Sequence, residues 1–311
     1  MPPDVSLIIV SHNTRGHLEH CLSELGTGHE VIVVDTGSTD GSRELVRDRF
    51  PHTRLLHLAG NPGYGGALNA GIALASGQRL LLLNADTWPL PHAVERLVEF
   101  AEREPSAGVV GPRLLDSDRK LQPSVRGFPT LWRLATEYLF LRWLAPRSRA
   151  LNAFYGSGFD HGSRREVDFV VGAVMLVRRQ MLDEIGGFDA SFFMFNEEVD
   201  LCYRARKSGW RVVFWPGSEF VHVGGASTAA VWPHMYREQL RSHLRFLAKH
   251  HGLREAERAR KLLATAMRIR AFVFGILGRR ERRALSLDAA AWLQSGDTSA
   301  LLGPSSPPQT L

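Results

Sequence analysis

Residues 30–42 have the sequence Glu-Val-Ile-Val-Val-Asp-Thr-Gly-Ser-Thr-Asp-Gly-Ser, an apolar run that ends abruptly in a turn of small polar residues. Such a run predicts a buried strand at Glu30–Val34, followed by a helix at Ser42–Arg49. The same pattern occurs on both sides of it. We expect strands at Val5–Val10, Leu55–Leu58 and Arg79–Leu83, and helices at Gly16–Leu25, Gly66–Ala75 and Pro91–Arg103. This alternation predicts an α/β fold with a mainly parallel central sheet and helices on both faces.

Polar residues follow three of these predicted strands. They are Ser11-His12-Asn13, the turn that Asp35 opens, and Asn84-Ala85-Asp86. Ligands of open parallel sheets bind at the carboxyl ends of the strands, so we expect these groups to lie at one site. An acid such as Asp35 can accept hydrogen bonds from a base or a ribose, although it can also simply stabilise its own turn. Asp86 suits a hard divalent cation that also binds phosphate oxygens. The alternative interpretation is that Asp86 is an exposed acid in a turn, without a ligand.

A glycine-rich loop, Asn61-Pro62-Gly63-Tyr64-Gly65-Gly66, precedes one of the predicted helices. Loops of this kind can present backbone N–H groups to phosphates. The first strand is not followed by Gly-x-Gly-x-x-Gly, which argues against a nicotinamide dehydrogenase, and the P-loop pattern is absent from the sequence.

The apolar segment 192–201 contains three carboxylates, Glu197, Glu198 and Asp200. Carboxylates in apolar surroundings raise one another's pKa, which suits a general base beside a metal or a diphosphate. The alternative is a helix start, because acids in a first turn interact favourably with the helix dipole. His222 lies between apolar and glycine-rich segments and suits a metal only if Asp86 converges on it.

The middle of the chain predicts further strands. Residues 109–130 are typical of a hairpin or meander with its turn at residues 116–118, and residues 131–165 suggest a mobile loop preceded by some helix. We expect a strand at Val167–Val177, a helix at Arg179–Ile185 and a strand at Val212–Trp215.

The positive charge is concentrated near the C-terminus. The chain has 311 residues and a net charge of +6, but residues 237–283 contain 14 Lys/Arg and only 4 Asp/Glu. We expect one helix at Trp232–His250 and a second, basic helix from Arg254, followed by a disordered tail at 296–311. The two cysteines, Cys21 and Cys202, lie in apolar helical patterns and predict reduced core residues of a cytoplasmic protein. No signal peptide or membrane-spanning run is recognisable.

Two faces of these C-terminal helices suggest a membrane contact. A basic stripe is formed by residues four apart, Arg237, Arg241, Arg245 and Lys249. An apolar face, Leu262 to Ile276, is accompanied by arginines up to Arg283, a combination that suits an anionic membrane surface. The alternative is packing on the α/β domain or on a second subunit, as in a homodimer through these helices. A nucleic-acid-binding module is not recognisable.

Taken together, these motifs resemble the family 2 inverting glycosyltransferases of GT-A fold, in particular the rhamnosyltransferase-like branch. The resemblance covers roughly residues 5–230. It rests on the segments 6–13, 33–42, 61–71, 83–86, 121–129, 186–189 and 192–204, and on His222 with Gly224 and Ser227.

The resemblance implies a role for each matching residue. Glu198 corresponds to the general base, with Glu197 and Asp200 as further catalytic candidates; the family's usual Glu-Asp pair is Glu197-Glu198 here. Asp86 and His222 are expected to bind Mg²⁺ or Mn²⁺ against the donor diphosphate. Donor binding is expected from Ser11, His12, Asn13, Asp35, Asn61, Gly63, Asn69 and Asn84.

The implied activity is metal-dependent transfer of a sugar from a nucleotide sugar, with dTDP-rhamnose favoured over UDP- and GDP-sugars, to a glycan or polyprenyl-linked acceptor. The alternative is a non-catalytic relative that binds nucleotide sugar or polysaccharide. Residues 1–231 would form the GT-A catalytic domain, with donor binding in about 1–115 and acceptor binding and catalysis in about 116–231. Residues 232–295 would form a basic helical appendage. A polyprenyl-linked acceptor would place the enzyme in the cytoplasm, peripherally at the inner membrane face.

Overall fold

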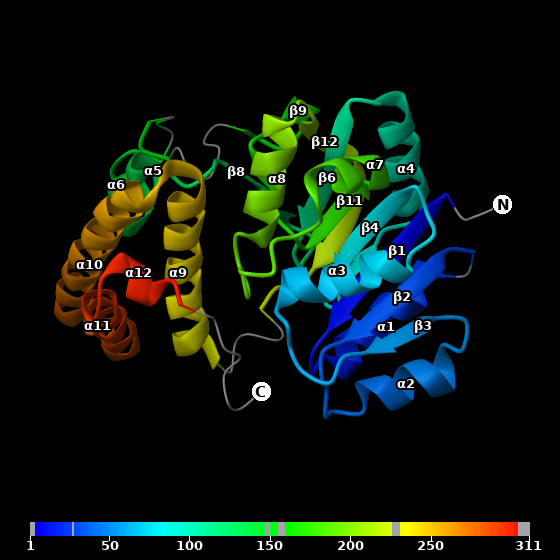
Figure 1. The fold of residues 1–311 in the computed structure, drawn as a ribbon, viewed down its shortest axis with the longest axis horizontal. Coiled ribbons are helices and arrows are strands. Elements are labelled where there is room, and N and C mark those ends of the chain that lie inside the picture. Colours follow the sequence, from blue (N-terminus) through cyan, green and yellow to red (C-terminus); the bar gives the residue numbers. More distant parts are fainter. Residues whose placement is uncertain are drawn as a thin grey trace.

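The computed structural model describes residues 4–26, 28–146, 148, 150–152, 154, 159–225 and 231–303. Its N-terminal part has the predicted alternation of strands and helices (Figure 1). The strands β3, β2, β1 and β4 lie side by side and parallel, in that order. These elements are β1 (Val5–Ser11), α1 (Arg15–Leu25), β2 (Glu30–Asp35), α2 (Ser42–Arg49), β3 (Arg54–His57), α3 (Tyr64–Leu74) and β4 (Arg79–Asn84).

The sheet continues beyond β4 with strands of both directions. In the described part of the chain its main path is β3-β2-β1-β4-β11-β6-β12-β5, with β7 paired to β6 and β9 paired to β12. The remaining elements of this half are β5 (Thr87–Pro89), α4 (Ala93–Arg103), β6 (Ala107–Leu115), β7 (Leu121–Gln122), β8 (Val125–Arg126), β9 (Arg165–Glu166), β10 (Phe169–Val170), β11 (Val174–Arg178), α7 (Arg179–Ile185), α8 (Glu197–Lys207) and β12 (Arg211–His222). The prediction of a mainly parallel sheet with helices on both faces is confirmed, and β11 is antiparallel to both of its neighbours.

Alternate residues of the parallel strands face two separate hydrophobic cores. Ile8 and Leu82 belong to the core that includes residues of α3 and α8, whereas Leu7 and Leu81 belong to the core with α1 and α4. Because both faces are covered, the strands are apolar at successive positions rather than at every second one. Cys21 and Cys202 are buried and unpaired, as the sequence predicted.

Two strand predictions need correction. The segment Val167–Val177 is not one strand: it is interrupted between β10 and β11, where Gly172 lines a pocket. The strand predicted at Val212–Trp215 continues to His222, because a register shift against β6 between Trp215 and Glu219 accommodates the Pro-Gly pair that follows Trp215. Both departures change which residues reach the pocket.

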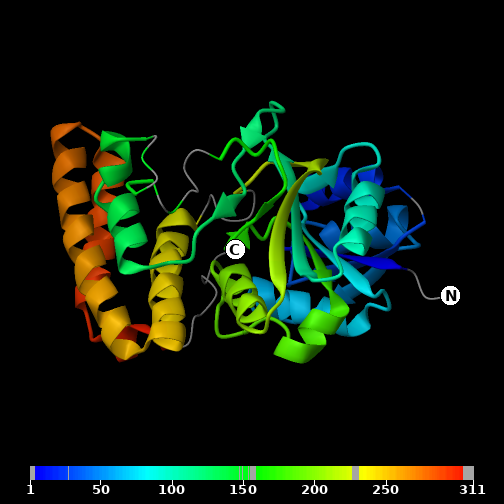
Figure 2. The same ribbon diagram turned by 90° about the horizontal axis from the view of Figure 1, so that it is seen from above.

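The C-terminal helices form a bundle beside the α/β part (Figures 1 and 2). In the view from above, α5, α9 and α10 lie next to one another, and α10 contacts both of the others. The bundle consists of α5 (Leu131–Tyr138), α6 (Leu141–Leu144), α9 (Trp232–His251), α10 (Leu253–Ile276), α11 (Arg280–Gln294) and α12 (Thr298–Leu301). Leu244 of α9 and Leu263 of α10 belong to the same hydrophobic core as Leu201 of α8, so these helices pack on the α/β part.

The basic stripe predicted on α9 faces the protein interior. Arg237 pairs with Asp288 of α11, and Lys249 pairs with both Asp189 and Asp200. Arg241 and Arg245 donate to backbone carbonyls at 301–303. The predicted stripe is therefore paired within the protein rather than free, because α9 lies between the α/β part and the other helices.

The predicted disordered tail begins too early. Residues 298–301 form α12, in which Asp297 accepts a hydrogen bond from the Ala300 N–H and Leu301 is buried. Residues from 304 onward, most of the predicted mobile loop around 155–158, and Ser227 lie outside the described residues. Among the described helices, none is both long and apolar enough to cross a bilayer.

Candidate functional site

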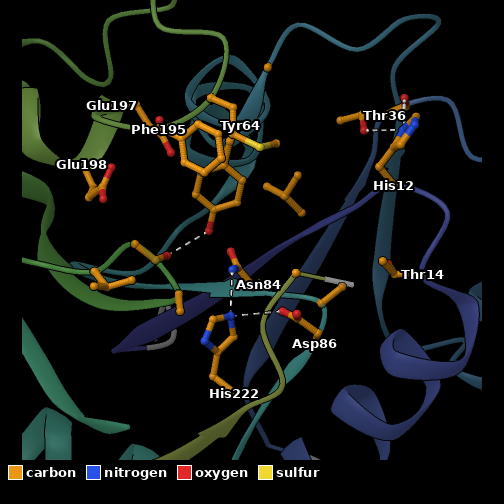
Figure 3. A pocket seen from close by; sticks show the side chains of 18 of the residues that line it. His12, Thr14, Thr36, Tyr64, Asn84, Asp86, Phe195, Glu197, Glu198 and His222 are labelled. Atoms are coloured by element: carbon orange, nitrogen blue, oxygen red, sulfur yellow. Dashed lines mark hydrogen bonds and ion pairs between the residues drawn. The ribbon is translucent and has the colours of Figure 1, made fainter. Parts of the chain in front are cut away.

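A pocket of about 250 Å³ opens at the carboxyl ends of β1 and β4. Its walls also include the N-terminus of α8, the loop that precedes α3 and the last residue of β12 (Figure 3). Predicted site residues that line it are His12, Asn61, Gly63, Asn84, Asp86, Glu197, Glu198 and His222. Segments far apart in the sequence thus meet at the sheet edge where the strand-end pattern placed the site.

Asp86 and His222 converge at the floor of this pocket. The His222 Nε2 atom lies 3.5 Å from Asp86 Oδ1, and the other carboxylate oxygen accepts a hydrogen bond from the Gly224 N–H. Pairing of β12 with β5, which aligns His222 with Thr87, brings the histidine beside the strand-end acid. The condition set by the sequence, that Asp86 must converge on His222, is therefore met.

Gln122 fixes the tautomer of His222. The amide nitrogen of Gln122 donates to the His222 carbonyl, so its Oε1 faces His222 Nδ1, at 2.7 Å. Nδ1 then carries the proton, and the lone pair of Nε2 is directed to the side of Asp86. Burial lowers the pKa of His222, although Asp86 opposes this shift. A neutral imidazole with a free Nε2 is the form that binds metals.

These two side chains fit a divalent cation that takes its remaining ligands from elsewhere. Asp86 offers one carboxylate and His222 one oriented nitrogen, and the Asn84 amide lies 3.4 Å from that nitrogen. In the described part of the chain no cluster of three or more His, Cys, Asp or Glu residues could hold a metal alone. An open, two-ligand site leaves coordination positions for phosphate oxygens.

Glu197 and Glu198 begin α8 and face the pocket from another wall. The Oε2 atoms of both are buried and have no hydrogen-bond partner among the residues that the structure describes. Burial raises the pKa of Glu197 well above its usual range, and the adjacent Glu198 carboxylate raises it further. Burial also raises the pKa of Glu198, although backbone N–H groups and Arg126 oppose the shift. Two buried carboxyl groups that each have one unsatisfied oxygen are costly in a purely structural helix start, which favours a chemical role.

The turn that precedes these acids is strained and is held by α9. Phe195 and Asn196 both have positive φ, at 66° and 64°. The Asn196 side chain donates to Nδ1 of the buried His243, at 2.9 Å, and Ser242 donates to the carbonyl of Met194. Two successive left-handed residues without glycine cost free energy and persist only when the surroundings fix them. The helical bundle therefore positions the acidic pair.

On the opposite side of the pocket, the ends of β1 and β2 are joined by side chains. His12 contacts the Thr36 carbonyl through Nδ1, at 2.9 Å, and both residues line the pocket. Asp35 is 1% exposed and accepts hydrogen bonds from two turn N–H groups and from His57, while its second oxygen has no partner. Asp35 lies behind Thr36 rather than in the pocket wall.

Four other predicted residues do not line the pocket. Ser11 contacts Thr14, and Asn13 accepts a hydrogen bond from Thr39 N–H, so both shape the strand-end loops. Asn69 bonds to the backbone of Phe188 and ties α3 to the loop before α8. Asp200 was a catalytic candidate, but it is fully buried in a cluster with Arg204, Lys249 and His250. It lies two helical positions after Glu198, hence on nearly the opposite side of α8.

Sequence reasoning also missed residues of the site. Tyr64 and Phe195 line the pocket, and the Tyr64 hydroxyl donates to the Gly172 carbonyl. Tyr64 follows Gly63 and Phe195 lies two residues before Glu197. This proximity to predicted site residues could have identified both. Gln122 contacts the site through His222, which lies 100 residues away in the sequence. Nothing in the sequence around Gln122 indicates that it orients this histidine.

Comparison with known proteins shows which family the sequence resembles. Residues 6–186 match the model of glycosyl transferase family 2, and residues 151–249 match that of glycosyl transferase family 21. The chain is 33% identical over 237 residues to an N-acetylglucosaminyl-diphospho-decaprenol L-rhamnosyltransferase of Mycobacterium tuberculosis, covering 71% of this chain and 76% of that protein. It is 25% identical over 258 residues to the rhamnosyltransferase WbbL of Escherichia coli, and this match covers 79% of this chain and 93% of that protein.

A solved structure shares the fold. The mannosyltransferase PcManGT of Pyrobaculum calidifontis, determined with GDP-Man and Mn²⁺, is 16% identical and superimposes with a TM-score of 0.55, covering 95% of this chain and 88% of that one. The fold is therefore that of the GT-A glycosyltransferases. Since the family model spans more than half of the 311 residues and a relative of 33% identity aligns over most of the chain, the protein is an enzyme of glycosyl transferase family 2.

Proposed function

We propose that the protein transfers a hexose, by preference rhamnose from dTDP-rhamnose, from a nucleotide sugar to a lipid-linked or glycan acceptor with inversion at the anomeric carbon. The observation that carries this proposal is the convergence of two groups on one pocket. The oriented Asp86–His222 pair lies at its floor (Figure 3). Glu197 and Glu198 lie on another wall, and the Oε2 atom of each has no hydrogen-bond partner among the described residues.

Glu198 is the general base of this proposal. As the acceptor hydroxyl oxygen attacks the anomeric carbon, its proton passes to Glu198, and the bond from that carbon to the diphosphate oxygen breaks on the opposite face. The bonding pair leaves with the diphosphate, so no covalent enzyme intermediate is needed. Burial raises the pKa of Glu198 and makes its carboxylate a stronger base near neutral pH.

Asp86 and His222 would hold the divalent cation, for which Mn²⁺ and Mg²⁺ are the candidates. Such a cation neutralises charge that develops on a leaving diphosphate. The chain itself supplies the open two-ligand site and, through Gln122, the correct histidine tautomer. The bound Mn²⁺ of the mannosyltransferase structure supports a cation here.

The donor and acceptor classes rest on the relatives. Two of them are named rhamnosyltransferases, and one name specifies a diphospho-decaprenol acceptor. The pocket residues His12 and Thr36 lie where the nucleotide would extend along the ends of β1 and β2. Asp35, behind Thr36, would support that wall from below rather than touch the base.

The second candidate function is nucleotide-sugar binding without turnover. It is favoured by one observation, the Glu197-Glu198 pair at the position where the family usually has Glu-Asp. The longer side chain shifts the reach of the base by one methylene. The free Oε2 atom of Glu198 in the pocket favours catalysis over this alternative.

The decisive experiment measures donor turnover and nucleotide binding in parallel. The full chain is incubated with dTDP-rhamnose, UDP-glucose or GDP-mannose and Mn²⁺, with and without a polyprenyl-diphospho-sugar acceptor, and calorimetry gives the affinity for each nucleotide. We expect acceptor-dependent release of dTDP, a loss of about 10²-fold or more in Glu198→Gln, and unchanged dTDP affinity in that variant. Asp86→Asn should weaken Mn²⁺ binding.

Glu197→Gln is the matched control for the base, since the two acids are adjacent and both face the pocket. If Glu197→Gln loses transfer while Glu198→Gln keeps it, the base is assigned to the wrong residue. Tight nucleotide binding without turnover of any donor would favour the binding alternative.

A further inference from the structure

The outer face of α10 exposes large apolar side chains. Phe272 is 70% exposed, Ile276 71% and Ile269 42%, and Leu277, which follows the helix, is 62% exposed. Positions 269, 272 and 276 recur at helical spacing and therefore share one face. The opposite face of the same helix, with Met267 and Ala271, is buried in the bundle. An exposed apolar row of this size on an otherwise well-packed helix calls for a partner.

Four arginines follow the C-terminal end of this row. Arg279, Arg280, Arg282 and Arg283 are exposed at the turn into α11. None of the four forms an ion pair with a carboxylate among the residues that the structure describes. The sequence from 268 to 287 contains Glu281 as its only acid. This region differs from α9, whose basic residues are satisfied internally.

Two neighbouring features extend the same end of the bundle. Phe140 packs against Phe274 of α10, which places α6 there with Trp143 65% and Leu144 77% exposed. A groove of about 560 Å³ between α9, α10 and α11 is mainly apolar and contains two arginines. Its lining residues are Trp232, Pro233, Tyr236, Arg270, Phe274, Glu281, Arg282, Leu285 and Ser286.

We propose that this end of the bundle docks on an anionic bilayer. We name the docking surface the α10 tip and define it as Ile269, Phe272, Ile276 and Leu277 with Arg279, Arg280, Arg282 and Arg283. The apolar side chains enter the boundary between headgroups and acyl chains, and the arginines bind lipid phosphates. The proposed association is with the surface of the bilayer.

Charge favours a bilayer over other occupants. A second copy that met this surface in a symmetric dimer would place its four unpaired arginines against the same four, which repel. A nucleic acid would match the arginines but leave the apolar row in contact with phosphates and water. An anionic bilayer satisfies both components. The inference is independent of the proposed transfer reaction, because vesicle binding can be measured without a donor or an acceptor.

The test uses the full chain and sedimentation with vesicles of phosphatidylcholine alone or of equal parts phosphatidylcholine and phosphatidylglycerol. We expect binding to the anionic vesicles, weakening as salt rises. The double variant Phe272→Ser/Ile276→Ser should bind at least tenfold more weakly. In the double variant Arg279→Gln/Arg280→Gln, the affinity for anionic vesicles should fall about fivefold for each charge removed.

Matched controls lie at the other end of the same helix. Leu253 is 55% exposed and Arg254 is exposed, so Leu253→Ser and Arg254→Gln remove similar groups outside the α10 tip and should leave binding unchanged. Circular dichroism and thermal unfolding show whether each variant is folded.

Several results would overturn the proposal. The first is that the wild type does not bind vesicles. The second is that the control variants lose as much vesicle affinity as the variants of the α10 tip. The third is that binding to neutral and to anionic vesicles is equal. Concentration-dependent dimerisation that Phe272→Ser/Ile276→Ser abolishes would assign the surface to a second copy. Displacement of the vesicles by DNA, with no effect of the apolar substitutions, would assign it to nucleic acid.

Discussion

Asp200→Asn tests whether this acid joins the bundle to the catalytic part or takes part in the chemistry. The Asp200 carboxylate is fully buried and lies 2.7 Å from each of Arg204 Nε, Lys249 Nζ and His250 Nε2. These contacts outweigh the effect of burial and lower its pKa from 3.8 to about 2. The amide preserves the size of the side chain but removes its negative charge.

The magnitude follows from the pKa shift. One pKa unit corresponds to about 1.4 kcal/mol, so the shift of nearly two units contributes about 2 kcal/mol to the free energy of unfolding. Because the folded-state pKa is lower than the unfolded one, this stability is fully present above about pH 4 and disappears as the pH falls toward about 2. We therefore expect Asp200→Asn to lose about 2 kcal/mol near neutral pH and less near pH 3.

Urea unfolding of the wild type and the variant at both pH values measures this difference. Asp183→Asn, an exposed acid on α7, is the control and should change the free energy by less than about 0.5 kcal/mol. Donor turnover per folded molecule should stay within a few-fold of wild type, because Asp200 is not in the pocket wall. Unchanged stability combined with lost turnover would refute the reasoning and restore Asp200 as a catalytic residue.

Two further predictions concern the turn before the acidic pair. Gly63→Ala should destabilise the protein by at least about 2 kcal/mol, because Gly63 has φ +82° and an added Cβ would lie 2.2 Å from the Phe193 carbonyl oxygen. Thermal unfolding measures this loss. The control is Gly16→Ala, whose added Cβ meets no described atom within 4 Å and which should not destabilise the protein. His243→Ala should lower the turnover rate while nucleotide affinity is unchanged, since it removes the partner of Asn196; equal steady-state rates of the two proteins would exclude a positioning role.

Most of the α/β part could be predicted from local patterns. The apolar runs at β1, β2 and β4 and the turn residues that follow them gave both the strands and the edge of the sheet at which the pocket lies. The predictions deviated where the chain leaves regular pairing. Gly172 divides a predicted strand, and the register shift after Trp215 extends another to His222, because these features depend on the neighbouring strand rather than on the segment itself.

The site was predicted less completely than the sheet. Asp86, Glu198 and His222 were candidates from the sequence because acids and histidines beside apolar runs are conspicuous, and all three line the pocket. Asp200 had the same signal and proved to lie in an ion cluster with Lys249, which comes from another helix. The offset of two residues places Glu198 and Asp200 on nearly opposite sides only if both belong to the helix, as they do in α8.

The sequence by itself determined the alternation of strands and helices, the polar strand ends and the family motifs, because each is a property of neighbouring residues and their spacing. Only the tertiary structure decided which charged groups meet. It placed Asn84 beside His222, 138 residues away. It also paired the basic residues of α9 with carboxylates and carbonyls of other elements, whereas the arginines after α10 form no ion pair with any described residue. The physical reason is that a charge acts through whatever group lies within a few ångströms of it, and long-range packing sets that distance.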